Sequence, residues 1–241
     1  MKIGILQTGR APDEAQPEYG DYNAFFIRYL TGRGFDFQTY AVLDGDIPKS
    51  PADAQGWLIT GSKFGAYEDH AWIPPLEAFL RDTFAAEVPI FGVCFGHQIL
   101  AQALGDKVAK YPQGWSVGPQ TYKSDLFGDQ KMIAWHQDQV VTRPAQACVA
   151  GSSAFCENAI LTYGNHALTI QPHPEFSVPF FHALLDHRGG VLPDTIRQQA
   201  SNADTNNLSS QAFADTVEDF FKRRGKFAHT AQKTGSSKSV R

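Results

Sequence analysis

A cysteine at the junction of a strand-like run and a helical run is the first residue here that could do chemistry. Cys94 follows the apolar run at 88–93, and Gly92 and Gly96 lie two residues to either side of it. Flanking glycines permit a tight, strained strand-to-helix turn that projects a nucleophile. A thiol at a helix N-terminus also lies at the positive end of the helix dipole, which favours the thiolate. The pattern predicts a nucleophile at Cys94; the alternative is a small buried core cysteine.

A cysteine nucleophile needs a base, normally a histidine that a carboxylate orients, and the fold can bring both from distant segments. Of the eight histidines, His173 is distinctive, because an apolar run at 168–171 ends in Pro172-His173-Pro174-Glu175. Prolines on both sides fix the backbone and exclude a helix. The pattern favours His173 as the base, and the alternative is a rigid surface turn. His97 is a weaker choice, because adjacent helical residues point about 100° apart.

The two segments together resemble the class I glutamine amidotransferases. The resemblance rests on two motifs, G-x-C-x-G-x-Q at 92–98 and H-P-E at 173–175. The chain looks most like the free-standing members that are similar to the glutaminase domain of GMP synthase. The resemblance runs from about residue 1 to 221. It implies that Cys94 attacks the γ-carboxamide of glutamine or a related γ-glutamyl amide, that His173 transfers the proton, and that Glu175 orients His173. Ammonia or an amine leaves, and water hydrolyses the thioester.

The resemblance also implies which groups stabilise the oxyanion. The backbone N–H of Phe95, directly after the nucleophile, is one expected donor. A loop after an earlier strand supplies the second, and here Gly61 and Ser62 follow the strand-like run at 56–60. Many members have consecutive glycines and a proline in this loop, so the departure here leaves open which N–H donates. An ordinary strand-ending turn is the alternative.

Two further side chains are expected to border the substrate. Gln98 ends the first motif and, one helical turn past Cys94, can point the same way. His136 lies in a segment at 134–140 that resembles the H-x-D-x-V segment of the family, and the alternative is a strand-end histidine facing water. No Cys or His pair has C-x-x-C or H-x-x-x-H spacing, so neither a metal site nor a cofactor is expected.

Alternating strands and helices must position these residues. Strand-like runs at 2–8, 37–42, 56–60 and 88–93 alternate with a helix capped by Asp21 and one near 75–86, and further helical patterns follow at 177–188, 193–200 and 211–224. This alternation predicts one α/β domain with a mostly parallel, flavodoxin-like open sheet and helices on both faces. Short β-like stretches between 107 and 169 predict an antiparallel extension. The domain is expected to span 1–225, and 226–241 to be a polar, basic, disordered tail.

Charge and composition restrict the partners. The formal net charge is −4, but residues 222–241 carry seven basic and no acidic residues, so the preceding body is distinctly acidic. An acidic body argues against a nucleic-acid partner. No apolar run approaches the roughly 20 residues of a membrane span, so no membrane association is expected. The three cysteines and the absence of a leader-like start indicate the cytoplasm.

Three functions remain open at this point. The first is a free-standing hydrolase of glutamine or of γ-glutamyl compounds that acts through a γ-glutamyl thioester. The second is a glutaminase subunit that supplies ammonia to a separate synthetase chain, because no G-x-x-x-x-G-K-[ST] phosphate loop occurs here. The third is a catalytically idle regulatory protein on the same scaffold.

Overall fold

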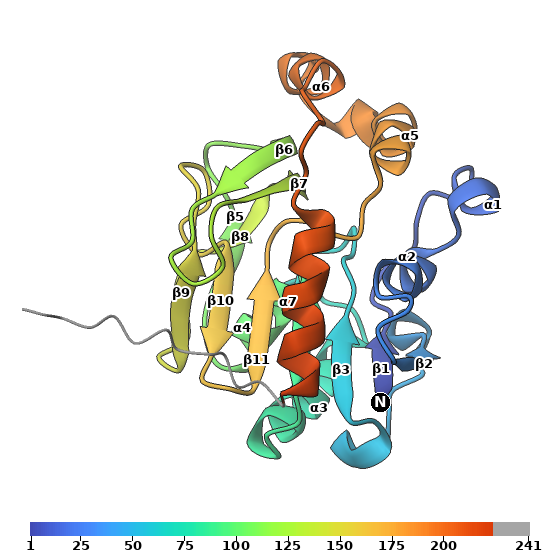
Figure 1. Ribbon diagram of the computed structural model, residues 1–241, viewed down its shortest axis with the longest axis vertical. Coiled ribbons are helices and arrows are strands. Elements are labelled where there is room, and N and C mark those ends of the chain that lie inside the picture. The colour runs from blue at the N-terminus through green and yellow to red at the C-terminus, as the bar shows by residue number, and fades with distance from the viewer. Residues whose placement is uncertain (224–241) are drawn as a thin grey trace, which may run out of the picture.

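A seven-stranded sheet forms the centre of the computed structural model, which describes residues 1–223 (Figure 1). The strand order is β2-β1-β3-β4-β11-β10-β9. The first five strands of that order pair in parallel, and the last two pair antiparallel. In chain order the strands of this sheet are β1 (Lys2–Leu6), β2 (Asp36–Tyr40), β3 (Gly56–Ile59), β4 (Ile90–Val93), β9 (Ala147–Gly151), β10 (Ile160–Tyr163) and β11 (Ala167–Ile170). The predicted α/β fold with a mostly parallel sheet is therefore confirmed.

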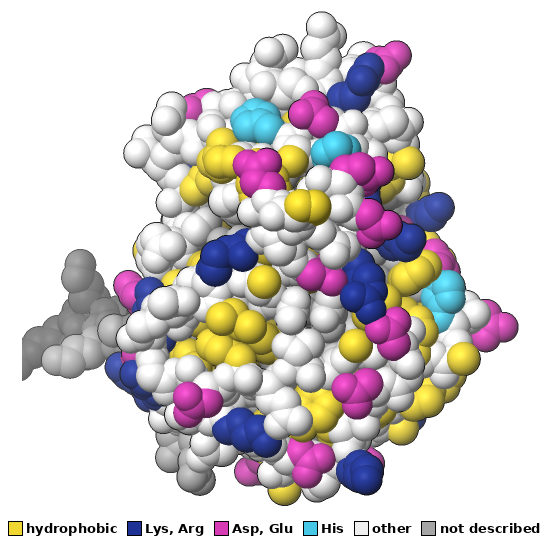
Figure 2. Space-filling view, turned by 90° about the vertical axis from the view of Figure 1, so that its right-hand side faces the viewer, with side chains coloured by type: hydrophobic (Ala, Val, Ile, Leu, Met, Phe, Trp, Pro, Cys, Tyr) yellow, Lys and Arg dark blue, Asp and Glu magenta, His cyan; other side chains and the backbone are white. Residues whose placement is uncertain are grey.

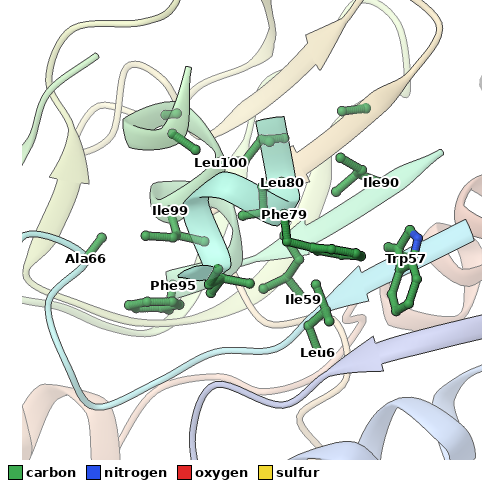
Figure 3. Close-up of a cluster of buried hydrophobic side chains, with 14 of the residues drawn as sticks. Leu6, Trp57, Ile59, Ala66, Phe79, Leu80, Ile90, Phe95, Ile99 and Leu100 are labelled. Atoms are coloured by element: carbon green, nitrogen blue, oxygen red, sulfur yellow. The ribbon is translucent and has the colours of Figure 1, made fainter. Parts of the chain in front are cut away.

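Helices cover both faces of this sheet (Figure 1). Helices α2 (Tyr22–Tyr29) and α7 (Ser210–Lys222) pack on one face, and α3 (Ile73–Ala85) and α4 (Phe95–Ala103) pack on the other. Alternate strand side chains point to opposite faces, so each strand contributes to both cores. Figure 3 shows Phe95, Ile99 and Leu100 of α4 beside Phe79 of α3 and Ile59 of β3.

The region 107–169 differs in part from the predicted antiparallel extension. Only β9 and β10 extend the main sheet in that way, whereas β11 pairs in parallel with β4. The remaining strands form two separate two-stranded sheets, β5 (Val108–Lys110) with β8 (Asp138–Val140) and β6 (Ser116–Tyr122) with β7 (Gln130–His136). The long β6–β7 hairpin packs on α6 (Asp194–Ser201) instead of joining the sheet edge.

A third apolar cluster lies beyond the carboxyl ends of the parallel strands. It joins the β6–β7 hairpin to α2, α5 (Val178–Arg188) and α6 through Phe25, Ile133, Phe180 and Phe181. Ser177 caps α5, since its hydroxyl accepts a hydrogen bond from the Phe180 N–H. Short helical turns complete the chain: α1 (Gln16–Tyr19), where only a loop was expected, and 3-10 turns at Val42–Asp44, Pro51–Asp53 and Gly189–Val191.

The remaining expectations concern the C-terminal tail, membrane association and surface charge. The proposed domain end at 225 and the tail at 226–241 lie outside the described residues. Across residues 1–223, no helix combines the length and apolar character needed to cross a bilayer. Figure 2 shows acidic and basic side chains intermingled on the face that it presents, without an extended basic patch there.

Candidate active site

Cys94 lies at a strained turn between β4 and α4. Its backbone angles are φ 53° and ψ −102°, a left-handed region that residues other than glycine adopt rarely and that is found at functional sites. A Cβ on Gly92 would lie 2.5 Å from the Gly96 carbonyl oxygen, and one on Gly96 would lie 2.5 Å from that of Ile59. The two glycines therefore allow the turn to close against itself and against β3, as the nucleophile-elbow pattern predicts.

The strand next to β4 brings His173 to this turn. The Cys94 N–H donates to the Ile170 carbonyl at 2.8 Å, so the end of β11 lies directly beside the elbow. Three residues later the His173 N–H donates to the Ile133 carbonyl, also at 2.8 Å, which fixes the histidine backbone to the β6–β7 hairpin. The His173 ring then stacks on Phe176, with centroids 4.0 Å apart and planes 9° apart. The base is thus held by backbone bonds on one side and by a ring on the other.

Glu175 reaches back to the same histidine. Its Oε1 lies 2.8 Å from Nδ1 of His173, and the two side chains are only 2% and 5% exposed. Burial lowers the pKa of His173, but the charges of Glu175 and Cys94 and their hydrogen bonds outweigh this effect and raise it above its ordinary value. The chain turns at Pro174 and Glu175, directly after His173, and this turn allows the i, i+2 contact. A buried imidazole whose protonated form is favoured can donate a proton to a leaving amine.

Glu175→Gln tests the electrostatic part of this arrangement. Because the Glu175 charge favours the imidazolium, its removal should lower the pKa of His173, by about 1–3 units for a contacting charge. The basic limb of the pH profile of kcat/KM, where the protonated form is lost, should therefore move to lower pH. Glu77→Gln, on α3 away from the site, is the control and should keep the wild-type limb. An unmoved limb in Glu175→Gln would contradict the assignment.

The expected oxyanion donors lie around the sulfur. Phe95 is the first residue of α4, so its N–H has no acceptor within the helix. A Cβ on Gly61 would lie 3.0 Å from Cε1 of His173 and 3.7 Å from Cβ of Cys94. A side chain at position 61 would therefore be crowded against the His173 ring, whereas its distance to Cys94 would be an ordinary van der Waals contact. Ser62 lines the cleft beside Cys94, and its hydroxyl accepts from the Phe64 N–H.

Gln98 and His136 meet at one carbonyl. Nε2 of Gln98 donates to the Asp138 carbonyl at 2.9 Å and to Oε1 of Gln171 at 3.1 Å. Nδ1 of His136 lies 3.2 Å from the same Asp138 carbonyl. Burial lowers the pKa of His136 to about 3, so the ring is neutral and donates through Nδ1. Both side chains line the cleft, and the alternative of a histidine facing water is wrong, because His136 is 4% exposed.

His97 belongs to the core and not to the cleft. It is fully buried, and its Nδ1 lies 2.8 Å from Oγ1 of Thr169. Burial lowers the pKa of this ring to about 3. A histidine with so low a pKa is a weak base, and His97 faces Thr169 of β11 and does not line the cleft, which agrees with the preference for His173.

The cleft above Cys94 has a volume of about 480 Å³. The sequence predicted the part of the cleft formed by Cys94, His173, the loop after β3 and the segment at 134–140, which contribute Lys63, Phe64, Gly65, Trp135, Gln137 and Asp138 to the lining. It did not predict the rest of the lining, because those residues carry no motif and come together only through tertiary packing. One such wall comes from the end of α5. The residues that the sequence did not indicate are Tyr22, Glu68, Lys110, Trp115, Phe176, Leu184, His187, Arg188, Gly190 and Val191.

Metal ligands do not gather here. In the described part of the chain, no three His, Cys, Asp or Glu side chains form a group that could hold a metal ion. His136 and His173 are each engaged through Nδ1, by the Asp138 carbonyl and by Glu175.

The fold and the site together define the class of α/β proteins with a nucleophile elbow: a cysteine follows one parallel strand and a histidine follows its neighbour. The model of the family "Glutamine amidotransferase class-I" matches residues 21–185. The chain belongs to the class I glutamine amidotransferase family.

Two relatives and one solved structure are similar to this chain. It is 27% identical to γ-glutamyl peptidase 4 of Arabidopsis thaliana over 232 residues, which cover 87% of this chain and 91% of that protein. A stretch of 127 residues is 32% identical to the glutamine-hydrolysing GMP synthase of Tropheryma whipplei, covering 49% of this chain and 24% of the synthase. The solved glutamine amidotransferase of Methylobacillus flagellatus has the same fold, with a TM-score of 0.72 at 20% identity, over 92% of this chain and 93% of that one.

Proposed function

We propose that this protein hydrolyses the amide bond of γ-glutamyl compounds, with Cys94 as nucleophile, His173 as acid and base, and Glu175 as the group that orients His173. The observation that carries the proposal is the 2.8 Å contact of buried Glu175 with His173 beside the strained elbow of Cys94. Membership of the family supports glutamine or a related γ-glutamyl compound as the substrate.

The reaction proceeds in two steps on these groups. The Cys94 thiol gives its proton to His173, and Sγ attacks the γ-carbonyl carbon. The protonated His173 then gives this proton to the leaving nitrogen, so that the C–N bond breaks and a γ-glutamyl thioester forms. In the second step neutral His173 takes a proton from water, and the water oxygen attacks the thioester carbon. The C–S bond breaks, His173 returns the proton to Sγ, and glutamate and the Cys94 thiol are released. During each step the negative oxygen is stabilised by the N–H of Phe95 and by a second N–H from the Gly61–Ser62 turn.

The cleft favours a free-standing hydrolase over an ammonia-supplying subunit. Its volume of about 480 Å³ falls in the range of sites that hold drug-sized ligands, and its lining extends from Cys94 and His173 to the end of α5. Glutamine, whose leaving group is only ammonia, leaves this space unfilled. A relative of similar length bears the name γ-glutamyl peptidase, which supports a γ-glutamyl compound with a larger amine part.

Turnover by the isolated chain tests the proposal. The purified protein is assayed alone on L-glutamine, γ-glutamyl methylamide and γ-glutamylglycine, and glutamate release is measured. Release from at least one of these compounds without any other protein is the expected result. Absence of turnover together with labelling of Cys94 by a diazo-ketone analogue of glutamine would instead favour a glutaminase subunit that needs a synthetase chain. Absence of both would favour a catalytically idle protein.

Thiol chemistry also suggests where the protein acts. Cys94, Cys148 and Cys156 are all free thiols, and the proposed mechanism requires Cys94 to stay reduced. A reducing compartment such as the cytoplasm meets this requirement.

A further inference from the structure

Arg188 is a fixed cation in the wall of the cleft. It ends α5 and lines the cleft. Its Nη2 donates to the Arg10 carbonyl at 3.0 Å, and its Nη1 donates to the Tyr22 hydroxyl at 3.4 Å. A guanidinium has five N–H donors, so these two contacts hold the group in place and leave three donors for a ligand.

Both acceptors of Arg188 are neutral. Within residues 1–223, no carboxylate forms an ion pair with Arg188, whereas five other arginines have at least one such partner: Arg10, Arg33, Arg81, Arg197 and Arg223. In that part of the chain Arg28 and Arg143 also have no ion pair, but they do not line the cleft. Arginine pairs preferentially with carboxylate or phosphate in a bidentate geometry. The charge of Arg188 is therefore available to an anionic ligand in the cleft.

The acidic groups of the cleft have other partners. Glu68 contacts Nε2 of His70 at 2.8 Å, and Asp138 shares a hydrogen bond with Tyr67. Lys110 acts electrostatically on both carboxylates. The negative charges of Glu68 and Asp138 are thus partly balanced by Lys110, and neither carboxylate pairs with Arg188.

Contacts around His173 indicate which end of the substrate Arg188 faces. The leaving nitrogen must accept its proton from His173, so the amine part of the substrate lies on the His173 side of Cys94. His173 stacks on Phe176, the Phe176 ring lies 6.3 Å from that of Tyr22, and the Tyr22 hydroxyl accepts from Arg188. This chain of contacts leads from the proton donor to the guanidinium.

From these contacts we infer that Arg188 determines specificity by binding a carboxylate in the leaving amine. The preferred substrates are then γ-glutamyl derivatives of amino acids or short peptides, and Trp115, Trp135 and Leu184 in the cleft wall accommodate the apolar part of that amine. This inference rests on the proposed γ-glutamyl hydrolase function. It adds Arg188 as a specificity residue and a negative charge on the leaving amine, and neither of these follows from the proposed roles of Cys94, His173 and Glu175.

A matched pair of substrates tests the role of Arg188. γ-Glutamylglycine and γ-glutamylglycinamide differ only in a carboxylate against a neutral carboxamide. Wild-type protein should have the higher kcat/KM for the acid, and Arg188→Gln should lower that value by about 10- to 100-fold, the range of a hydrogen bond to a charged group. The value for the amide should change little. Arg188→Lys should retain part of the preference for the acid, because it keeps the charge and loses the forked geometry.

Controls separate this effect from a change in the fold. Arg223→Gln removes a surface arginine that pairs with Asp219 on α7 and should keep the wild-type ratio of the two substrates. Binding to a Cys94→Ala protein, measured by calorimetry, should show the same preference for the acid and its loss in the double variant with Arg188→Gln.

Two results would overturn the inference while leaving the hydrolase function intact. One is turnover of both substrates by the wild type without preference for the acid. The other is an equal loss on both substrates in Arg188→Gln, which would assign Arg188 to the glutamyl α-carboxylate. Lack of any turnover or binding by the wild type would instead overturn the proposed function together with this inference.

Discussion

Replacing Cys94 with alanine should lower kcat/KM on γ-glutamyl substrates by at least about 10,000-fold, the scale seen when a catalytic nucleophile is removed. The reason is that the sulfur forms the thioester, and no other nucleophile lies at the elbow to replace it. Alanine fits the space of the thiol, and Cys94 is only 6% exposed, so the fold should be retained. Steady-state kinetics with a circular dichroism spectrum of the variant measure both effects.

Another cysteine supplies the control for Cys94→Ala. Cys148 is exposed on the edge strand β9, and Cys148→Ala should keep wild-type activity and wild-type labelling by a diazo-ketone analogue of glutamine. Labelling should disappear in Cys94→Ala alone. A Cys94→Ala protein that retains activity within tenfold of the wild type would exclude Cys94 as the nucleophile.

Gly96→Ala should destabilise the protein by about 3 kcal/mol, the upper part of the range for overpacking a core. The added Cβ would lie 2.5 Å from the Ile59 carbonyl oxygen and 2.7 Å from Cβ of Ile59. Both neighbours belong to β3 in the centre of the sheet, so α4 must move away from the strand. That movement would also displace Cys94 and the Phe95 N–H, so activity should fall with stability. Urea unfolding at constant pH gives the change in free energy of unfolding.

Gly190→Ala is the matched control for this substitution. Gly190 does not have a positive φ, and a Cβ there would have no atom within 4 Å. Its free energy of unfolding should therefore stay within about 0.5 kcal/mol of the wild type. Equal stability of Gly96→Ala and Gly190→Ala would show that the elbow does not depend on the close approach of α4 to β3.

Local patterns predicted the parts of the site that short sequence segments encode. The elbow around Cys94 depends on two glycines and an adjoining apolar run, and all of these lie within a few residues of each other. The contact of Glu175 with His173 was implied by the resemblance to the family and not by the local spacing, because residues two apart in an extended segment seldom contact each other directly. The chain order of strands and helices likewise predicted a mostly parallel sheet with helices on both faces.

Long-range pairing was predicted less well. The segments β6, β7 and β11 all belong to the short, turn-bounded β-like stretches from which an antiparallel extension was predicted. However, β11 pairs in parallel with β4 on one side and antiparallel with β10 on the other, and the β6–β7 hairpin forms a separate sheet. A strand's own sequence does not specify its partner, because pairing depends on packing against distant elements. For the same reason the cleft wall formed by Trp115 and Arg188 could not be found without the fold.

Because β4 and β11 are neighbouring strands, the distance between Cys94 and His173 does not depend on the residues that form the outer walls of the cleft. The Cys94 N–H donates to the Ile170 carbonyl, so the proposed nucleophile Cys94 and the proposed base His173 follow neighbouring strands whose spacing, about 4.8 Å, is set by the backbone hydrogen bonds. Side-chain changes in the hairpin or at the end of α5 leave that spacing unaltered. The scaffold can therefore acquire a new amine specificity through its outer walls while the machinery that cleaves the bond stays rigid, which makes those walls the place to redesign the enzyme.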